Sequence, residues 1–141
     1  MNTTEKILLC AETEVNAPIE KVWKLWTTPE DIMLWNAPSD DWYTANVENN
    51  VHAGGKFLFE MASRDGNSGF DYTGVYEKVS IHRLIAHTLT DGRKTTITFG
   101  EGTPVKITET FEAADDLPAD MQRSFCQAVL DRFKKYAESK L

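Results

Sequence analysis

Glu109 is the residue whose type and position most strongly suggest chemistry. It alternates with Val105, Ile107 and Phe111, so a strand here would place its carboxylate on the apolar face. A carboxylate in that position is costly unless it is paired or protonated, and it can orient a ligand in an apolar cavity. Arg123 is the candidate partner if the helix that carries it lies over the sheet. A structural ion pair, or a bulge that turns Glu109 outward, is the alternative.

Asp71 and His87 are the other acid–base candidates, and each falls within a predicted strand. Tyr72 and Tyr76 share one face of the strand that holds Asp71, where a tyrosine hydroxyl can donate a hydrogen bond to a ligand. Plain packing is the commoner role of strand aromatics, and a structural role is the commoner one for a strand histidine. These residues are therefore candidates for a binding site as well as for acid–base catalysis.

No motif for catalysis or metal binding accompanies these groups. The histidines show no zinc-binding spacing with cysteine or carboxylate residues, and neither Cys10 nor Cys126 lies in a motif of an activated thiol. The sequence contains neither a nucleophile elbow nor a phosphate-binding loop. We predict no catalytic residue, no metal and no cofactor, and the sequence favours a binding protein over an enzyme.

The length and charge of the chain narrow its class. With 141 residues it has the size of one domain, which we predict to span 1–141. Its formal net charge of −7 argues against nucleic acid and against an anionic membrane surface as partners. The N-terminal segment lacks the features of a secretory signal, and no stretch approaches the roughly 18 apolar residues of a membrane span. With only two cysteines, the sequence favours a cytoplasmic protein.

The spacing of the apolar residues predicts the order of elements. Alternation over 7–15 predicts a strand, and helical spacing after Pro18 and again after Pro29 predicts two short helices. From 42 to 113 the pattern predicts about six strands joined by turns such as Asp91-Gly92. The remaining segment predicts a long helix. Its expected apolar stripe consists of Met121, Phe125, Val129, Phe133 and Tyr136, flanked by Cys126, Leu130 and Ala137.

The separation of strands from helices indicates an α+β fold. We predict a curved antiparallel β-sheet of about six to seven strands wrapped around the long C-terminal helix, with two short helices after the first strand. A strongly bent sheet cannot follow a straight helix closely, so a hollow is expected between them. Small apolar ligands bind in such interior clefts. At the corner that leads into the second strand, Trp42 and Tyr43 alternate, so one of them faces the hollow.

Short motifs along nearly the whole chain carry a resemblance to a known family. They are Asn16–Trp23, Trp26–Glu30, Trp35-Asn36, Ser39–Trp42, Gly54–Phe57, Gly69–Asp71, Gly74–Tyr76, Asp91–Lys94, Thr108–Phe111 and Met121–Arg123. With these motifs the chain resembles the START-like superfamily of helix-grip proteins, also called SRPBCC or Bet v-type. Within it, the chain is similar to the branch of the C-terminal domain of the activator of the heat-shock-protein-90 ATPase. One departure is that Phe125-Cys126 stands where this branch usually has Gly-Trp, which implies a pocket of different shape.

The resemblance and the residues together favour a protein that binds a small, largely apolar molecule, lipid- or polyketide-like, between the sheet and the C-terminal helix. The candidate ligand-binding residues are Trp42, Phe57, Phe59, Tyr72, Tyr76, Glu109, Arg123, Phe125 and Val129. One alternative is a cyclase- or hydrolase-type enzyme that uses the same cavity, with Glu109, Asp71 or His87 as acid or base. Another, implied by the resemblance, is a chaperone-regulating interaction module with a role in stress response and an exposed apolar patch. The sequence does not decide whether the chain forms a homodimer.

Overall fold

A computed structural model describes residues 7–140, so both ends of the predicted 1–141 domain lie outside the described residues. Within this range the chain forms seven strands and three helices. In chain order they are β1 (Leu8–Val15), α1 (Ile19–Thr27), α2 (Pro29–Trp35), β2 (Trp42–Asn49), β3 (Lys56–Ser63), β4 (Gly69–Ser80), β5 (Leu84–Leu89), β6 (Lys94–Phe99), β7 (Val105–Glu112) and α3 (Ala119–Glu138). The α+β fold and the order of elements predicted from the sequence are confirmed.

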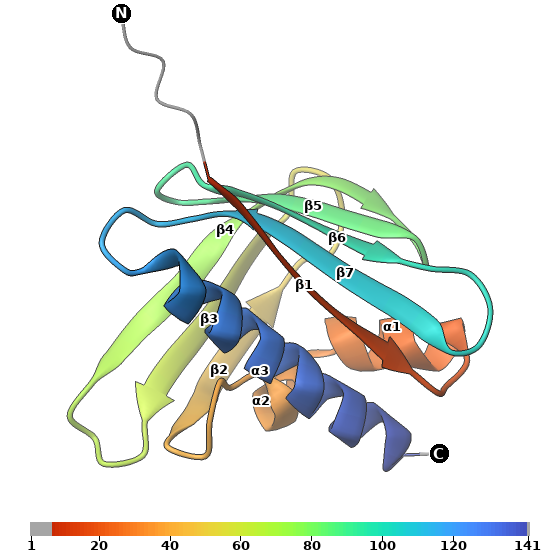
Figure 1. Ribbon diagram of the computed structural model, residues 1–141, viewed down its shortest axis with the longest axis horizontal. Coiled ribbons are helices and arrows are strands. Elements are labelled where there is room, and N and C mark those ends of the chain that lie inside the picture. The colour runs from red at the N-terminus through yellow and green to blue at the C-terminus, as the bar shows by residue number, and fades with distance from the viewer. Residues whose placement is uncertain (1–6, 141) are drawn as a thin grey trace, which may run out of the picture.

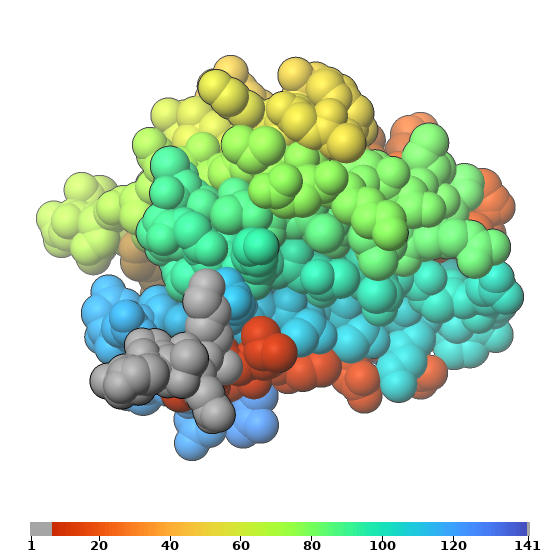
Figure 2. All heavy atoms as spheres, turned by 90° about the horizontal axis from the view of Figure 1, so that it is seen from above, coloured from red at the N-terminus to blue at the C-terminus, as the bar shows by residue number. Residues whose placement is uncertain are grey.

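The seven strands form one antiparallel sheet in the order β1-β7-β6-β5-β4-β3-β2. Strands β2 to β7 follow one another as a meander, and β1 returns to pair with β7, with Ala11 opposite Glu109. In Figure 2, which is seen from above, the red β1 lies next to the cyan β7, although the two strands are far apart in the chain. Helices α1 and α2 therefore carry the chain from one edge of the sheet to the other.

The sheet curls around α3, which runs across its concave side (Figure 1). Two irregularities in the pairing help the sheet to bend, one between Thr44 and Asn46 in β2 and one between Tyr76 and Lys78 in β4. Apolar and polar residues alternate along β6, where Thr95, Ile97 and Phe99 are buried. The concave face is therefore the core face of the sheet.

The buried face of α3 is not the predicted one: the helix is rotated about its axis by about one residue position. Met121 and Phe125 are exposed, whereas Gln122, Leu130 and Phe133 are buried. Tyr136 is half-buried and Ala137 is fully buried, so the same rotation applies at the end of the helix. The prediction that Phe125 faces the core was wrong, because Gln122 occupies the inward position one turn earlier.

Gln122 takes an inward position because the connection from β7 to α3 uses its amide. Its Nε2 donates to the carbonyl oxygens of Ala114, at 2.9 Å, and Leu117, at 2.8 Å. Its Oε1 accepts a hydrogen bond of 2.7 Å from the backbone N–H of Ala114. Three hydrogen bonds therefore satisfy this buried amide and fix the start of α3 against the end of β7.

Side chains of α3 also cover the free edge of β1. Gln127 bonds both the backbone N–H and the carbonyl of Glu12, at 3.3 and 2.9 Å. Lys134 donates to the carbonyl of Glu14 at 2.7 Å. These bonds occupy backbone groups that would otherwise be open to pairing with another chain.

The far half of α3 packs on the two short helices. The ring of Phe133 lies 4.9 Å from the Trp26 ring and 4.8 Å from the Trp35 ring, both in edge-to-face geometry. The indole N–H of Trp35 donates to the carbonyl oxygen of Leu25 at 2.9 Å, so its polar atom is satisfied inside the core. This aromatic cluster fixes one end of α3, and the other end lies over the strands that carry the candidate site.

Candidate functional site

The register of the sheet brings four polar side chains onto its concave face. Thr95 of β6 pairs with His87 of β5, and Ile97 of β6 pairs with Glu109 of β7. Tyr72 of β4 lies close enough to complete the group, since its hydroxyl oxygen is 3.2 Å from Nε2 of His87. Polar groups in a core need partners, so their interactions decide what the site can do.

Tyr72, His87 and Thr95 form a polar trio in which a hydrogen bond joins Tyr72 to His87. Besides its bond to His87, the hydroxyl of Tyr72 lies within hydrogen-bonding reach of the Thr95 side chain. His87 is only 6% exposed, and burial lowers its pKa to about 4, so the ring is neutral at pH 7. Burial also raises the pKa of Tyr72, with the nearby Glu109 carboxyl as the next contribution. Both groups therefore remain uncharged at neutral pH.

Glu109 faces α3, where its carboxyl lies within hydrogen-bonding reach of the Cys126 thiol. Burial raises the pKa of Glu109 to about 7, and the thiol offsets this in part. Burial also raises the pKa of Cys126, and the Glu109 carboxyl adds to that effect. Glu109 is therefore poised near half-ionisation at neutral pH, and Cys126 stays a thiol.

The predicted partner of Glu109 is not used. The guanidinium of Arg123 lies 3.4 Å from Asp120 on the same helix, and its side chain is 57% exposed. The rotation of α3 explains this, because it places Cys126 opposite the sheet and Arg123 toward solvent. Among residues 7–140, no lysine, arginine or histidine forms an ion pair with Glu109.

Glu109, Tyr72 and Cys126 lie deep in the protein but keep some solvent-accessible surface. Burial is the largest influence on all three pKa values, which means that protein atoms surround each group. By accessible surface, however, all three side chains are only half-buried. Each of these side chains is therefore surrounded by protein atoms and still keeps part of its surface accessible.

Aromatic rings line the strands next to the polar groups. Phe57 and Phe59 of β3 have ring centroids 5.5 Å apart, and Tyr72 lies stacked at 6.1 Å from Phe59. Tyr76 lies 5.0 Å from Phe57 and donates its hydroxyl proton to Asn49. Phe59 and Tyr72 are half-buried at the edge of the core, as is Val129 of α3. The predicted residues Phe57, Phe59, Tyr72 and Tyr76 thus form one aromatic cluster on the sheet, and Val129 of α3 packs against the same core.

Three other candidates lie elsewhere. Trp42 contacts Phe70 at the outer end of β2, with a ring distance of 5.7 Å, and is half-buried there. Phe125 is 48% exposed on α3. Asp71 points to the solvent side of β4, since its neighbour Tyr72 points inward, and it is exposed. Of the three acid–base candidates, only Glu109 and His87 face the interior, and the suggestion of Asp71 as an interior acid or base was wrong.

Sequence analysis did not identify Thr95 as a member of the site, and it treated Cys126 only as a change in pocket shape. Thr95 occupies a core-facing position in a strand of alternating residues, so its hydroxyl had to find a partner. That period-2 pattern was the available signal. For Cys126 no such signal existed, because its orientation depends on the rotation of α3.

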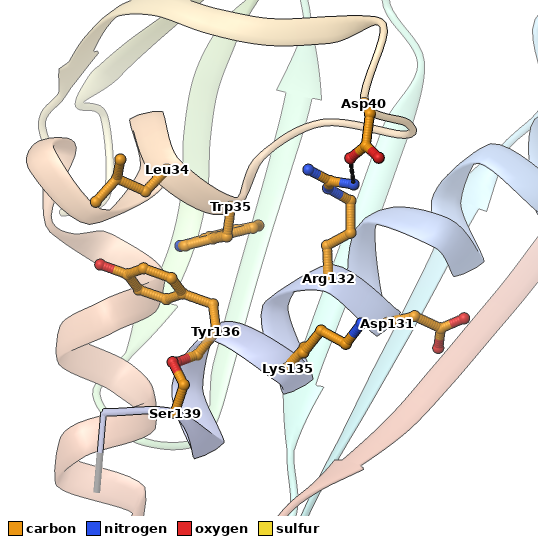
Figure 3. Close-up of a pocket in the computed structure, with 8 residues that line it drawn as sticks. All are labelled: Leu34, Trp35, Asp40, Asp131, Arg132, Lys135, Tyr136 and Ser139. Carbon is orange, nitrogen blue, oxygen red and sulfur yellow. Dashed lines mark hydrogen bonds and ion pairs between the residues drawn. The ribbon is translucent and has the colours of Figure 1, made fainter.

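A separate groove of about 560 Å³ lies on the surface between α2 and the end of α3 (Figure 3). Arg132 bonds the Asp40 carboxylate at 2.8 Å on one side, and Tyr136, Trp35 and Leu34 lie on the other. Nε of Arg132 is buried and has no hydrogen-bond partner among the residues that the structure describes. The groove contains charges of both signs and shares no residue with the polar cluster. A ligand in this groove would therefore be distinguishable from a ligand under α3.

Within residues 7–140, no cluster of three or more histidine, cysteine or carboxylate residues could hold a metal ion. In the same range, no helix has both the length and the apolar character needed to cross a membrane.

Comparison with known proteins places this fold among related ones. A family model described as "Activator of Hsp90 ATPase homolog 1-like protein" matches residues 16–138. The solution structure of an AHSA1-like protein from Aeromonas hydrophila has 32% identity and a TM-score of 0.88, over 95% of this chain and 94% of that one. A protein from Cytophaga hutchinsonii has 40% identity and a TM-score of 0.78, over 96% and 93% of the two chains. No curated protein matches the chain.

Proposed function

The chain belongs to the activator of Hsp90 ATPase homolog 1-like family, and we propose that it binds a small, largely apolar molecule between the concave face of the sheet and α3. The observation that carries this proposal is the combination of burial and remaining accessibility at Glu109, Tyr72 and Cys126. These polar groups lie deep under α3 and yet retain accessible surface. Concave, mostly apolar sites with a few convergent polar groups are typical of small-molecule binding.

The ligand would lie with its apolar body against Phe59, Tyr72 and Val129, which are half-buried and border the core. Its polar atom would meet Glu109. Burying apolar surface supplies the affinity, at roughly 25 cal/mol per Å², and the polar groups set the orientation.

A blocking substitution on α3 tests this proposal. Cys126→Trp introduces a large side chain beside Glu109, and a site under α3 should then lose binding. Ser124→Trp is the matched control, since Ser124 is exposed on the same helix. Thermal stabilisation by a panel of lipids, polyketides and flavonoids is measured for both variants and for the unmodified chain. A stabilising compound that acts equally on Cys126→Trp, or a panel with no stabilising compound, would contradict the proposal.

A second candidate function is the binding of a heat-shock-protein-90 chaperone, as the family's name suggests. The observation that favours it is a pair of exposed apolar residues one turn apart on α3, Met121 and Phe125, with the exposed Leu117 in the loop just before the helix. Replacing the three residues with glutamine should abolish capture of a heat-shock-protein-90 homologue and any effect on its ATPase rate. If the unmodified chain neither binds this chaperone nor changes its ATPase rate, this candidate fails.

A further inference from the structure

We propose that the ligand of this site carries a protonated amine on an aromatic or otherwise flat apolar body, and that Glu109 is the group that recognises the amine. This inference rests on the proposed function, because it specifies the ligand class for the same site. Three features of the site lead to it. They are the missing counter-charge, the excess of hydrogen-bond acceptors and the aromatic wall.

The first feature is that nothing in the described structure neutralises Glu109. The strands on either side present Ala11 and Ile97 opposite it. The nearest cationic influence in the cluster is Arg93, which acts on Tyr72 and not on Glu109. An ionised carboxylate in such a position is costly, and a ligand cation would remove that cost by pairing with it.

The second feature is a count of donors and acceptors. The single thiol proton of Cys126 can be donated to Glu109. The hydroxyl of Tyr72 already has His87 as a hydrogen-bond partner at 3.2 Å, and the tautomer of His87 decides which of the two donates. An ionised carboxylate offers about four acceptor sites, so most of those on Glu109 remain open. A ligand that completes the site must therefore bring hydrogen-bond donors, and an ammonium group brings three together with a positive charge.

The third feature is the aromatic wall. The half-buried rings of Phe59 and Tyr72 are stacked at 6.1 Å, and Phe57 lies within 5.8 Å of Tyr72. Flat apolar bodies pack well on such rings. A cation that lies over an aromatic face gains a further attraction of about 0.5–2 kcal/mol. The same wall that receives the apolar body therefore also favours the positive charge.

The titratable groups around Glu109 allow a pH test with a definite sign. Tyr72 from β4, His87 from β5 and Cys126 from α3 face it, and all three stay neutral between pH 6 and 8. Over this range Glu109 alone in the cluster changes its charge. An ammonium ligand should bind more tightly as pH rises through 7, and a neutral ligand should not.

Two probes of the same shape make the test. These are 2-(1-naphthyl)ethylamine, which stays protonated at both pH values, and the neutral 2-(1-naphthyl)ethanol. Affinities for the full chain are measured by NMR titration at pH 6 and pH 8. For a carboxyl with pKa near 7, the ionised fraction rises about tenfold between these values, so the amine should bind about tenfold more tightly at pH 8. The alcohol should show no such gain.

Two variants assign the effect to Glu109. Glu109→Gln should lose most of the amine affinity and its pH dependence while it keeps the alcohol affinity. Glu48→Gln, at an exposed position of β2, is the matched control and should behave as the unmodified chain. If the amine still binds tightly to Glu109→Gln, attraction by the net negative charge explains it and the inference is overturned.

The remaining outcomes separate this inference from the proposed function. If the alcohol binds under α3 and the amine binds more weakly at both pH values, the inference falls and the proposed function stands. If neither probe binds, both fall. If the amine binds with the expected pH dependence and only to chains that retain Glu109, both are supported.

Discussion

The carboxyl of Glu109 on β7 meets the thiol of Cys126 on α3 and has no cationic partner in the described part of the chain. Strand β7 and the terminal helix α3 thereby meet at a titratable group. Since burial shifts the pKa of that group to about 7, its charge state affects both the stability of the fold and the chemistry of the site.

Removing the charge at position 109 should stabilise the protein above neutral pH. The pKa of Glu109 is raised in the folded state, so the folded chain binds the proton more tightly than the unfolded chain. Stability is then lost as pH rises from about 4.5 to about 7. We expect Glu109→Gln to unfold at a free energy close to that of the unmodified chain at pH 5. At pH 8 it should be more stable by about 1–3 kcal/mol. Urea unfolding at both pH values measures the difference.

Glu48→Gln serves as the control for that experiment, because its exposed carboxylate should give the same difference at both pH values. A Glu109→Gln variant that is less stable than the unmodified chain at pH 8 would show that the carboxylate has a structural cation partner.

The buried His87 should make the fold less stable as pH falls, whereas Glu109 makes it less stable as pH rises. Burial lowers its pKa to about 4, so the folded chain binds the proton less tightly than the unfolded chain. The stability that this provides is present above about pH 6.5 and is lost as pH falls toward 4. In a Glu109→Gln background, which removes the opposing effect, we expect a loss of about 2–3 kcal/mol between pH 6.5 and 4. Adding His87→Gln should abolish most of that loss.

The exposed His52 gives a matched control for the acid experiment, since His52→Gln should leave the pH dependence unchanged. If His87→Gln also leaves the pH dependence of stability unchanged, the His87 ring is not buried as the structure places it.

Gln122→Ala should destabilise the junction between β7 and α3. The substitution removes three hydrogen bonds and leaves the carbonyls of Ala114 and Leu117 without this partner. At about 1 kcal/mol for each bond, we expect a loss of about 2–4 kcal/mol in the free energy of urea unfolding. Ser124→Ala, at an exposed position two residues away, should cost little. A loss no larger than that of the control would mean that the bonds do not hold the junction.

Phe133→Ala should cost about 3–5 kcal/mol, because Phe133 is fully buried between Trp26 and Trp35. The tryptophan fluorescence of the folded state should change at the same time, since both indoles lose their neighbour. Guanidinium unfolding followed by fluorescence measures both effects. A cost below about 1 kcal/mol would show that the end of α3 does not depend on this cluster.

The strands could be predicted from the sequence because their alternation is a local property. That alternation predicts the inward side of Glu109 in β7, and it would also have indicated Thr95 in β6. The turns between the strands have equally local signals, such as Asp91-Gly92. The sequence was therefore sufficient for the sheet and for Glu109, His87 and Tyr72 of the polar group, but it did not indicate their partners.

The rotation of α3 could not be predicted in the same way. Apolar residues at two neighbouring sets of positions made two stripes available, and the choice between them depends on the hydrogen bonds of Gln122 to the loop between β7 and α3. This choice decides whether Arg123 or Cys126 meets Glu109. The partner of the central carboxyl is thus a tertiary property, and the helix sequence alone pointed to the wrong residue.

The most direct test of the central claim is to locate a bound probe by intermolecular nuclear Overhauser effects with 2-(1-naphthyl)ethanol. A ligand between the sheet and α3 should show contacts from its ring protons to the side chains of Phe59, Tyr72 and Val129. These contacts should disappear in Cys126→Trp. Contacts to Leu34 and Tyr136 instead would place the probe in the surface groove between α2 and α3, and would contradict the account.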